Sequence, residues 1–310
     1  MIRPISPVSS VARWMFRLVL VGCLMPFGSL SAEADDKTEG VRLYHQQQYR
    51  EAAPLLLRAA RKGDAKAQAA LGVMYQEGRG VPQDDARARK WFEKAARQNR
   101  ADAQTFLGML YCQGRGVQKD FVVAKNWFEK AAEQDFAPAQ TLVGLMYANG
   151  TGTLKNMTQA ERWLSRAAAQ GETDAQTFLG MLYLDGTELP QDVPGAVRLF
   201  TQAAEKGDAN AQAALGMMYF SGKGVPENPA EAEKWLEKAA TAGHVEAQTF
   251  LGNLYYKGIG VVKDDAKAGY WLQKAAIAGD PDAQATLDDL LGNDRPNPSV
   301  SDEVTEKTGN

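Results

Sequence analysis

The amino-acid sequence repeats itself every 36 residues, and this period constrains the fold more than any other feature. Residues 65–100 align without a gap onto residues 101–136. A period of about 20 to 50 residues indicates a repeat architecture, in which each unit buries its apolar face against its neighbours. Glycine recurs at this spacing, at Gly72, Gly108, Gly144, Gly180, Gly216 and Gly252. The period predicts six complete units, at residues 65–100, 101–136, 137–172, 173–208, 209–244 and 245–280.

Each unit is predicted to contain two helices. In the first unit Leu71, Met74 and Tyr75 fall at helical spacing on one face, and Gly78-Arg79-Gly80 then ends the first helix. The second helix carries a stripe of Ala88, Trp91, Phe92, Ala95 and Ala96. Because every unit repeats this pattern, the chain is predicted to be an all-α solenoid of helix-turn-helix repeats.

Residues that favour helix ends recur at both ends of the second helix. The column before it holds Asp84, Asp120, Asn156, Asp192, Asn228 and Asp264, all good N-caps. The column after it holds Gly63, Asn99, Asp135, Gly171, Gly207, Gly243 and Gly279, which tolerate the left-handed conformation of a C-cap. Glycine inside a helix costs about 1 kcal/mol relative to alanine. We therefore expect the column of Gly72 to allow a close approach of neighbouring helix backbones.

The residues outside the six units suggest an export signal and two caps. Arg3, Arg13 and Arg17 precede an apolar run that ends near Ala32-Glu33-Ala34, so residues 1–34 are predicted to be a cleaved signal peptide. Leu20-Val21-Gly22-Cys23 leaves open a lipid anchor at Cys23. Residues 35–64 are predicted to form a capping helix pair, residues 281–292 a capping helix, and residues 293–310 a disordered tail.

Composition excludes several classes of function. Removing residues 1–34 takes away three arginines and Glu33, so the net charge of −3 becomes about −5, which disfavours nucleic acid as a partner. The apolar run near the N-terminus is too short to span a bilayer, so no transmembrane segment is expected.

The periplasm is the predicted location of the chain. Secretion to the medium and an outer-membrane lipoprotein anchored through Cys23 are the alternatives.

The repeated phrase resembles the Sel-one-like repeat, a relative of the tetratricopeptide repeat. The phrase is A-x-A-Q-x-x-L-G-x-x-Y-x-x-G-x-G-V, followed by A-x-x-W-x-x-K-A-A. The resemblance implies a right-handed superhelix and a role as adaptor or scaffold. Exported bacterial members of this family include regulators of envelope signalling and host-interaction factors. The fourth unit departs from the pattern, with Glu188 for the second loop glycine and Leu199 for tryptophan.

No catalytic or metal site is predicted, and no cofactor. The histidines, His45 and His244, lie more than five units apart, and His244 occupies a variable turn column where a solvated side chain is expected. Cys112 remains as a lone thiol after signal removal, with no histidine expected near it. The recurring Gly78-Arg79-Gly80 loop is interpreted as a structural turn and not as a phosphate cradle.

One face of the first helices is a candidate binding surface. The columns of residues 69, 73 and 76 point away from the main apolar stripe, toward the side where such solenoids have their concave wall. The candidates are Thr105, Met109, Cys112, Thr141, Leu145, Thr177, Met181, Leu184, Met217, Phe220, Thr249, Asn253 and Tyr256. Methionine suits an adaptable binding surface. The alternative is that these residues only pack between adjacent first helices.

These observations predict an exported scaffold that binds a peptide or protein segment on its concave surface and regulates an envelope complex. A secreted host-interaction factor is a second interpretation with the same physical basis. A third is a protein or enzyme that binds cell-wall fragments or β-lactams. The sequence does not identify the partner.

Overall fold

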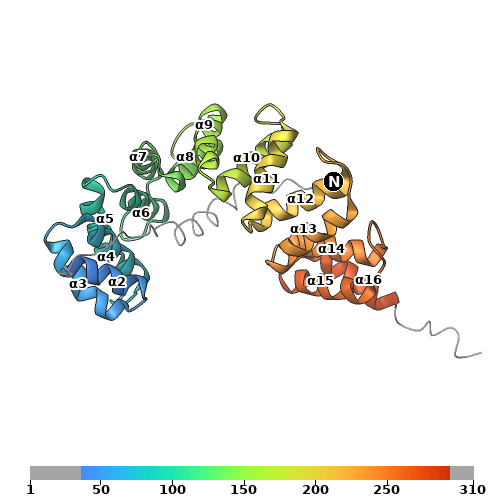
Figure 1. The fold of residues 1–310 in the computed structure, drawn as a ribbon, viewed down its shortest axis with the longest axis horizontal. Helices are drawn as coiled ribbons and strands as arrows, with labels where there is room; N and C mark the ends of the chain where they lie inside the picture. The colour runs from blue at the N-terminus through green and yellow to red at the C-terminus, as the bar shows by residue number, and fades with distance from the viewer. Residues whose placement is uncertain (1–35, 294–310) are drawn as a thin grey trace, which may run out of the picture. The chain divides into compact units, whose positions relative to one another are not determined.

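The computed structural model describes residues 36–293, which form fifteen helices and no strand (Figure 1). The predicted signal peptide with Cys23, and the tail from residue 294 onward, lie outside the described residues. The helices are α2 (Asp36–His45), α3 (Tyr49–Arg61), α4 (Ala65–Glu77), α5 (Asp85–Arg97), α6 (Ala101–Gln113), α7 (Phe121–Ala132), α8 (Ala137–Asn149), α9 (Met157–Ala169), α10 (Thr173–Asp185), α11 (Val193–Glu205), α12 (Ala209–Ser221), α13 (Pro229–Thr241), α14 (Val245–Lys257), α15 (Asp265–Ile277) and α16 (Pro281–Asn293). The all-α solenoid predicted from the 36-residue period is confirmed.

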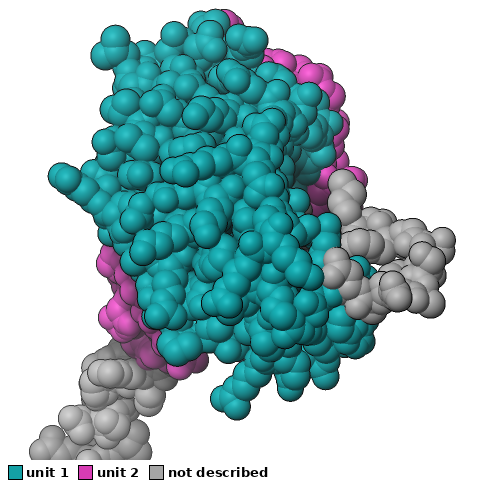
Figure 2. All heavy atoms as spheres, turned by 90° about the vertical axis from the view of Figure 1, so that its left-hand side faces the viewer, with its two compact units in different colours: residues 1–179 teal, residues 180–310 magenta. Residues whose placement is uncertain are grey.

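The chain divides into two compact parts, residues 1–179 and residues 180–310, with the boundary inside α10 (Figure 2). From here on these parts are called the first unit and the second unit, and the 36-residue elements are called repeats. In the first unit α2 packs on α3, α3 on α4, and so on to α9. In the second unit α11 to α16 follow the same rule. Each helix therefore finds its main partners next to it in the chain, as a repeat array requires.

The predicted helix caps are present at both ends of the second helices. At α5 the Asp84 carboxylate accepts a hydrogen bond from the backbone N–H of Arg87 at 2.9 Å, and the other five residues of this column cap their helices in the same way. All seven residues of the C-terminal column have positive φ, including Asn99 at 61° and Asp135 at 60°. Short polar side chains thus replace glycine in the left-handed conformation.

The glycine column has a different role from the one expected. A Cβ at Gly72 would lie 2.4 Å from Cε1 of Phe92, and a Cβ at Gly216 would lie 2.6 Å from Cγ of Leu236. Backbone atoms lie farther from such a Cβ than these side chains do. The carbonyl oxygen of Ala124, for example, would lie 3.0 Å from a Cβ at Gly108. Glycine therefore makes room chiefly for a large side chain of the second helix, twenty residues later, and only secondarily for backbone.

A buried glutamine in the first helix of each repeat forms a hydrogen bond with the repeat before it. The Nε2 of Gln140 in α8 donates a hydrogen bond to the carbonyl oxygen of Ala132, the last residue of α7, at 3.1 Å. Gln68, Gln104, Gln176, Gln212 and Gln248 make the same bond to the alanine eight residues earlier. The carbonyls at a helix C-terminus have no partner within the helix. The carbonyl of Ala132 accepts from the backbone N–H of Asp135, just beyond the helix, at 3.1 Å, and the glutamine of the next repeat supplies a second hydrogen bond.

The loop between the two helices of a repeat is bonded to the preceding repeat. The guanidinium of Arg115 donates to both carboxylate oxygens of Asp85, at 2.7 and 3.0 Å, and to the carbonyl oxygen of Gln76 at 2.9 Å. Gly116 has φ +66°, and a Cβ there would lie 2.7 Å from the backbone of Asp85. A residue with a side chain would therefore be strained and would clash at this position.

The loop of the fourth repeat, residues 173–208, differs from the others, as expected from Glu188 at the position of the second loop glycine. Among the described residues other than glycine, only Gln47, Asn99 and Asp135 have positive φ, so Glu188 does not adopt the left-handed conformation of Gly116. The neighbouring Leu189 is buried, with 7% of its surface exposed. The backbone of this loop therefore follows another path and inserts a leucine.

We predict that Gly180→Leu lowers the free energy of unfolding by about 3 kcal/mol, because Cε1 of Phe200 lies 2.9 Å from the position of a Cβ. Urea unfolding monitored by circular dichroism measures this. Gly292→Leu is the matched control, since nothing lies within 4 Å of its Cβ position in the last helix. Equal unfolding curves for the two variants would contradict the packing role of the glycine column.

Candidate protein-interaction surface

The structure buries the candidate residues of the first unit. Met109 and Cys112 belong to a core cluster with Phe128 and Met146. The buried candidates of the first unit are Thr105, Met109, Cys112, Thr141, Leu145 and Thr177, each at most 6% exposed. These six side chains therefore pack between helices, which was the alternative interpretation of the columns. They present no surface to a partner.

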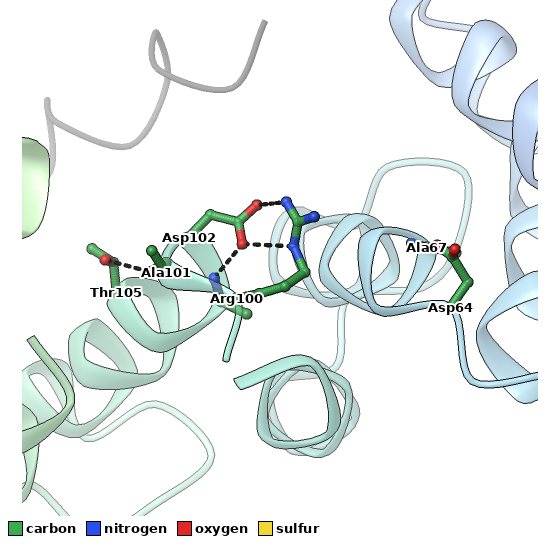
Figure 3. A network of polar contacts seen from close by, with 7 residues as sticks. Asp64, Ala67, Arg100, Ala101, Asp102 and Thr105 are labelled. Atoms are coloured by element: carbon green, nitrogen blue, oxygen red, sulfur yellow. Dashed lines mark hydrogen bonds and ion pairs between the residues drawn. The ribbon is translucent and has the colours of Figure 1, made fainter. Parts of the chain in front are cut away.

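Two of the threonines among them, Thr105 and Thr141, satisfy their hydroxyl groups within their own helix. Thr105 donates from Oγ1 to the carbonyl oxygen of Ala101 at 2.8 Å, and Thr141 does the same to Ala137 at 3.1 Å. Figure 3 shows Thr105 and Ala101 beside the ion pair of Arg100 and Asp102 at the start of α6. A hydroxyl bonded to the carbonyl four residues earlier is the usual solution for threonine inside a helix.

Burial also removes Cys112 as a nucleophile. Its side chain is 4% exposed, and burial raises the pKa of the thiol to about 12. Only the thiolate is a good nucleophile or metal ligand. Within residues 36–293, no three histidine, cysteine, aspartate or glutamate side chains lie together where they could hold a metal ion.

The second unit leaves its part of the same columns partly exposed. Met217 and Phe220 on α12 and Asn253 and Tyr256 on α14 are neither fully buried nor fully exposed. Met181 and Leu184 on α10 are also half-buried and pack on a core that includes Phe200, Leu215 and Met218. Thr249 is the exception, because it is 9% exposed and its hydroxyl donates to Asp280 at 2.8 Å.

Aromatic side chains join α12 and α14 into one apolar surface. The rings of Phe220 and Phe250 meet edge to face, with centroids 5.2 Å apart. The Tyr256 hydroxyl donates to the carboxylate of Asp289 on α16 at 2.6 Å, and Nζ of Lys263 lies 5.8 Å from the Tyr256 ring centroid. We call Met217, Phe220, Phe250, Asn253 and Tyr256 the first-helix face of the second unit. Phe250 lies outside the columns chosen from the sequence, and Asp289 continues the column of Asn253 beyond the candidates chosen there.

His244 is not solvated, in contrast to the expectation from its turn position. Its side chain is only 9% exposed, and Nδ1 accepts a hydrogen bond from the backbone N–H of Ala247 at 3.1 Å. The histidine is therefore the N-cap of α14. Burial lowers its pKa, while the carboxylates of Glu246 and Asp208 act in the opposite direction. The equivalent position in α4 and α12 holds aspartate, a common N-cap, which is the signal that could have identified this role.

The fold and this surface define the class of protein, an α-solenoid of tetratricopeptide-like helix pairs. The family model for the Sel1 repeat matches residues 65–99, 101–136, 137–172, 173–208, 209–244 and 245–280. The chain belongs to the Sel1 repeat family, a helical repeat fold that generally mediates protein–protein interaction. Within the described residues, no helix has the length and apolar character needed to cross a membrane.

Two solved structures are similar over most of the chain. A protective antigen present in uropathogenic Escherichia coli strains is 36% identical, with a TM-score of 0.73, over 83% of this chain. The match spans 56% of the length of that antigen. A Sel1 repeat protein from Oxalobacter formigenes is 34% identical, with a TM-score of 0.73, over 78% of this chain and 97% of its own length. No curated protein matches the sequence.

We predict that His244 makes stability depend on pH. The neutral ring is favoured in the folded chain, so the pKa of folded His244 lies below the unfolded value. Its contribution to stability is complete above the unfolded pKa of about 6.5. That contribution is lost as the pH falls through the lowered folded value. His244→Asn should keep the cap and lose less stability than the native chain between pH 7.5 and 5.0.

His244→Ala is the companion variant, and at pH 7.5 it should lower the free energy of unfolding by about 1 kcal/mol through loss of the cap. Urea unfolding at a series of pH values measures both effects. Parallel pH profiles for the native chain and His244→Asn would show that the histidine does not titrate in this way.

Proposed function

We propose that this chain is a non-catalytic scaffold that holds a peptide or protein segment of a partner on the first-helix face of the second unit. One observation carries the proposal. In the columns of residues 73 and 76, Met109, Cys112, Leu145 and Ala148 of the first unit are buried, whereas Met217, Phe220, Asn253 and Tyr256 of the second unit are partly exposed. Aromatic and methionine side chains are enriched where proteins bind one another.

The general role of Sel1 repeats in protein–protein interaction supports this proposal. The first-helix face is also the side that such solenoids use as their concave wall. The signal-like residues 1–34 support export, with the periplasm as the location and regulation of an envelope complex as the role. In this proposal the first unit does not bind the partner through these columns, because its equivalent side chains are packed in the core.

A second candidate is a secreted factor that acts on a host. Its specific support is the 36% identity to a protective antigen of uropathogenic Escherichia coli. The two candidates differ in where the chain works. Recovery of the chain from the culture medium favours the secreted factor, and recovery from the periplasmic fraction favours the envelope scaffold.

We predict that a photoreactive residue at position 253 crosslinks a partner protein in cells, whereas one at position 234 does not. Asn253 is half-buried on the first-helix face, between Phe250 and Tyr256 in α14, and Lys234 is exposed on the second helix α13, where it pairs with Glu231. Both substitutions leave the core intact. Mass spectrometry of the adducts identifies the partner. Adducts at position 234 with none at position 253 would place the interaction on the second helices and refute the proposal.

A further inference from the structure

The apolar surface on α12 and α14 ends at a carboxylate. Asp289 of α16 lies 36 residues after Asn253 and 72 after Met217, so it continues their column with a charged side chain. The hydrogen bond from the Tyr256 hydroxyl, 2.6 Å long, attaches this carboxylate to the first-helix face. The face therefore combines aromatic rings with a fixed negative charge at its C-terminal side.

Three more carboxylates lie on the same helices. Glu246 and Asp282 occupy equivalent positions in the first turns of α14 and α16, and both are exposed. Asp288 is exposed beside Asp289 and accepts a hydrogen bond from Nε2 of Gln284 at 2.9 Å. Because α16 is the capping helix, its outer side faces solvent and needs polar groups, which accounts for some of these carboxylates. The contact between Asp289 and Tyr256, however, places charge directly at the apolar surface.

Within the part of the chain that the structure describes, no lysine or arginine pairs with these carboxylates. Across residues 36–293 the structure holds no ion pair from a lysine or arginine to Asp282, Asp288 or Asp289. Glu246 faces His244 at 3.5 Å, and burial lowers the pKa of that ring. Lys263, the cation beside Tyr256, already pairs with Asp265 at 3.3 Å. Residues 180–293 carry nine lysines and arginines against sixteen aspartates and glutamates.

From this arrangement we infer that the bound segment is cationic and amphipathic, with apolar side chains for the aromatic surface and lysine or arginine for Glu246, Asp282 and Asp289. The inference rests on the proposed function and specifies the partner of the same face. Unpaired carboxylates next to an apolar surface gain charge-assisted hydrogen bonds from such a segment. An acidic segment would meet like charges, which cost several kcal/mol when placed together at an interface.

A designed peptide tests the inference directly. The probe is a fluorescein-labelled, acetylated 14-residue peptide of leucine and lysine at helical spacing, and its control carries glutamate in place of lysine. Fluorescence anisotropy with the chain lacking residues 1–34 should show binding of the lysine peptide and none of the glutamate peptide. Raising the salt concentration should weaken that binding, because exposed charges are screened.

Two pairs of variants locate the interaction. Asp282→Asn with Asp289→Asn should weaken binding of the lysine peptide about 10-fold, the usual effect of losing roughly 1.4 kcal/mol. Glu205→Gln with Glu237→Gln removes the same charge from the exposed side of the second helices α11 and α13 and should leave affinity unchanged. Circular dichroism confirms that each variant is folded.

The outcomes separate this inference from the proposed function. Equal binding of the two peptides, no binding of either, or an equal loss in both variant pairs overturns the inference. The crosslink at position 253 does not depend on the charge of the partner, so it decides the proposed function independently. Adducts at position 253 together with equal binding of both peptides would mean that the face binds protein without selecting for positive charge.

Discussion

The buried amide between successive repeats is the interaction on which the rest of the structure depends. A second helix ends with carbonyls that have no partner within the helix, and one of them accepts both a backbone N–H of the following turn and the side-chain amide of the glutamine in the next repeat. This bond is buried, and a typical hydrogen bond inside a protein contributes about 0.5 to 1.5 kcal/mol to stability. The bond also sets the register of each first helix on the preceding repeat. That register brings Phe220 of α12 against Phe250 of α14.

Regular stacking by itself gives no binding specificity, so function follows from departures from the repeat. The column of Met109, Met217, Asn253 and Asp289 shows this sequence of change. Met109 is a core residue, Met217 is half-buried, Asn253 adds a polar group, and Asp289 adds a charge bonded to Tyr256. The same backbone thus supports a packed first unit and, in the second, a surface that is apolar at its centre and acidic at its C-terminal side.

The sequence predicted the architecture well because local chemistry determines it. Asp84 caps α5 and Asn99 turns left-handed after it through contacts within a few residues. The candidate surface was predicted less completely. Helical spacing shows which way Met109 and Met217 point along a helix, but their exposure depends on neighbouring helices. Phe92 filling the space above Gly72, and the burial of His244, likewise depend on packing that periodicity does not encode.

Hydroxyl-radical footprinting of the chain, alone and bound to its captured partner, would show directly whether the partner covers the first-helix face, because it reports the solvent exposure of individual side chains. We expect Met217, Phe220, Phe250 and Tyr256 to be protected in the complex, while Trp235 and the exposed Tyr270 on the second helices react as before. Protection of Trp235 and Tyr270, with no change on α12 and α14, would contradict this expectation.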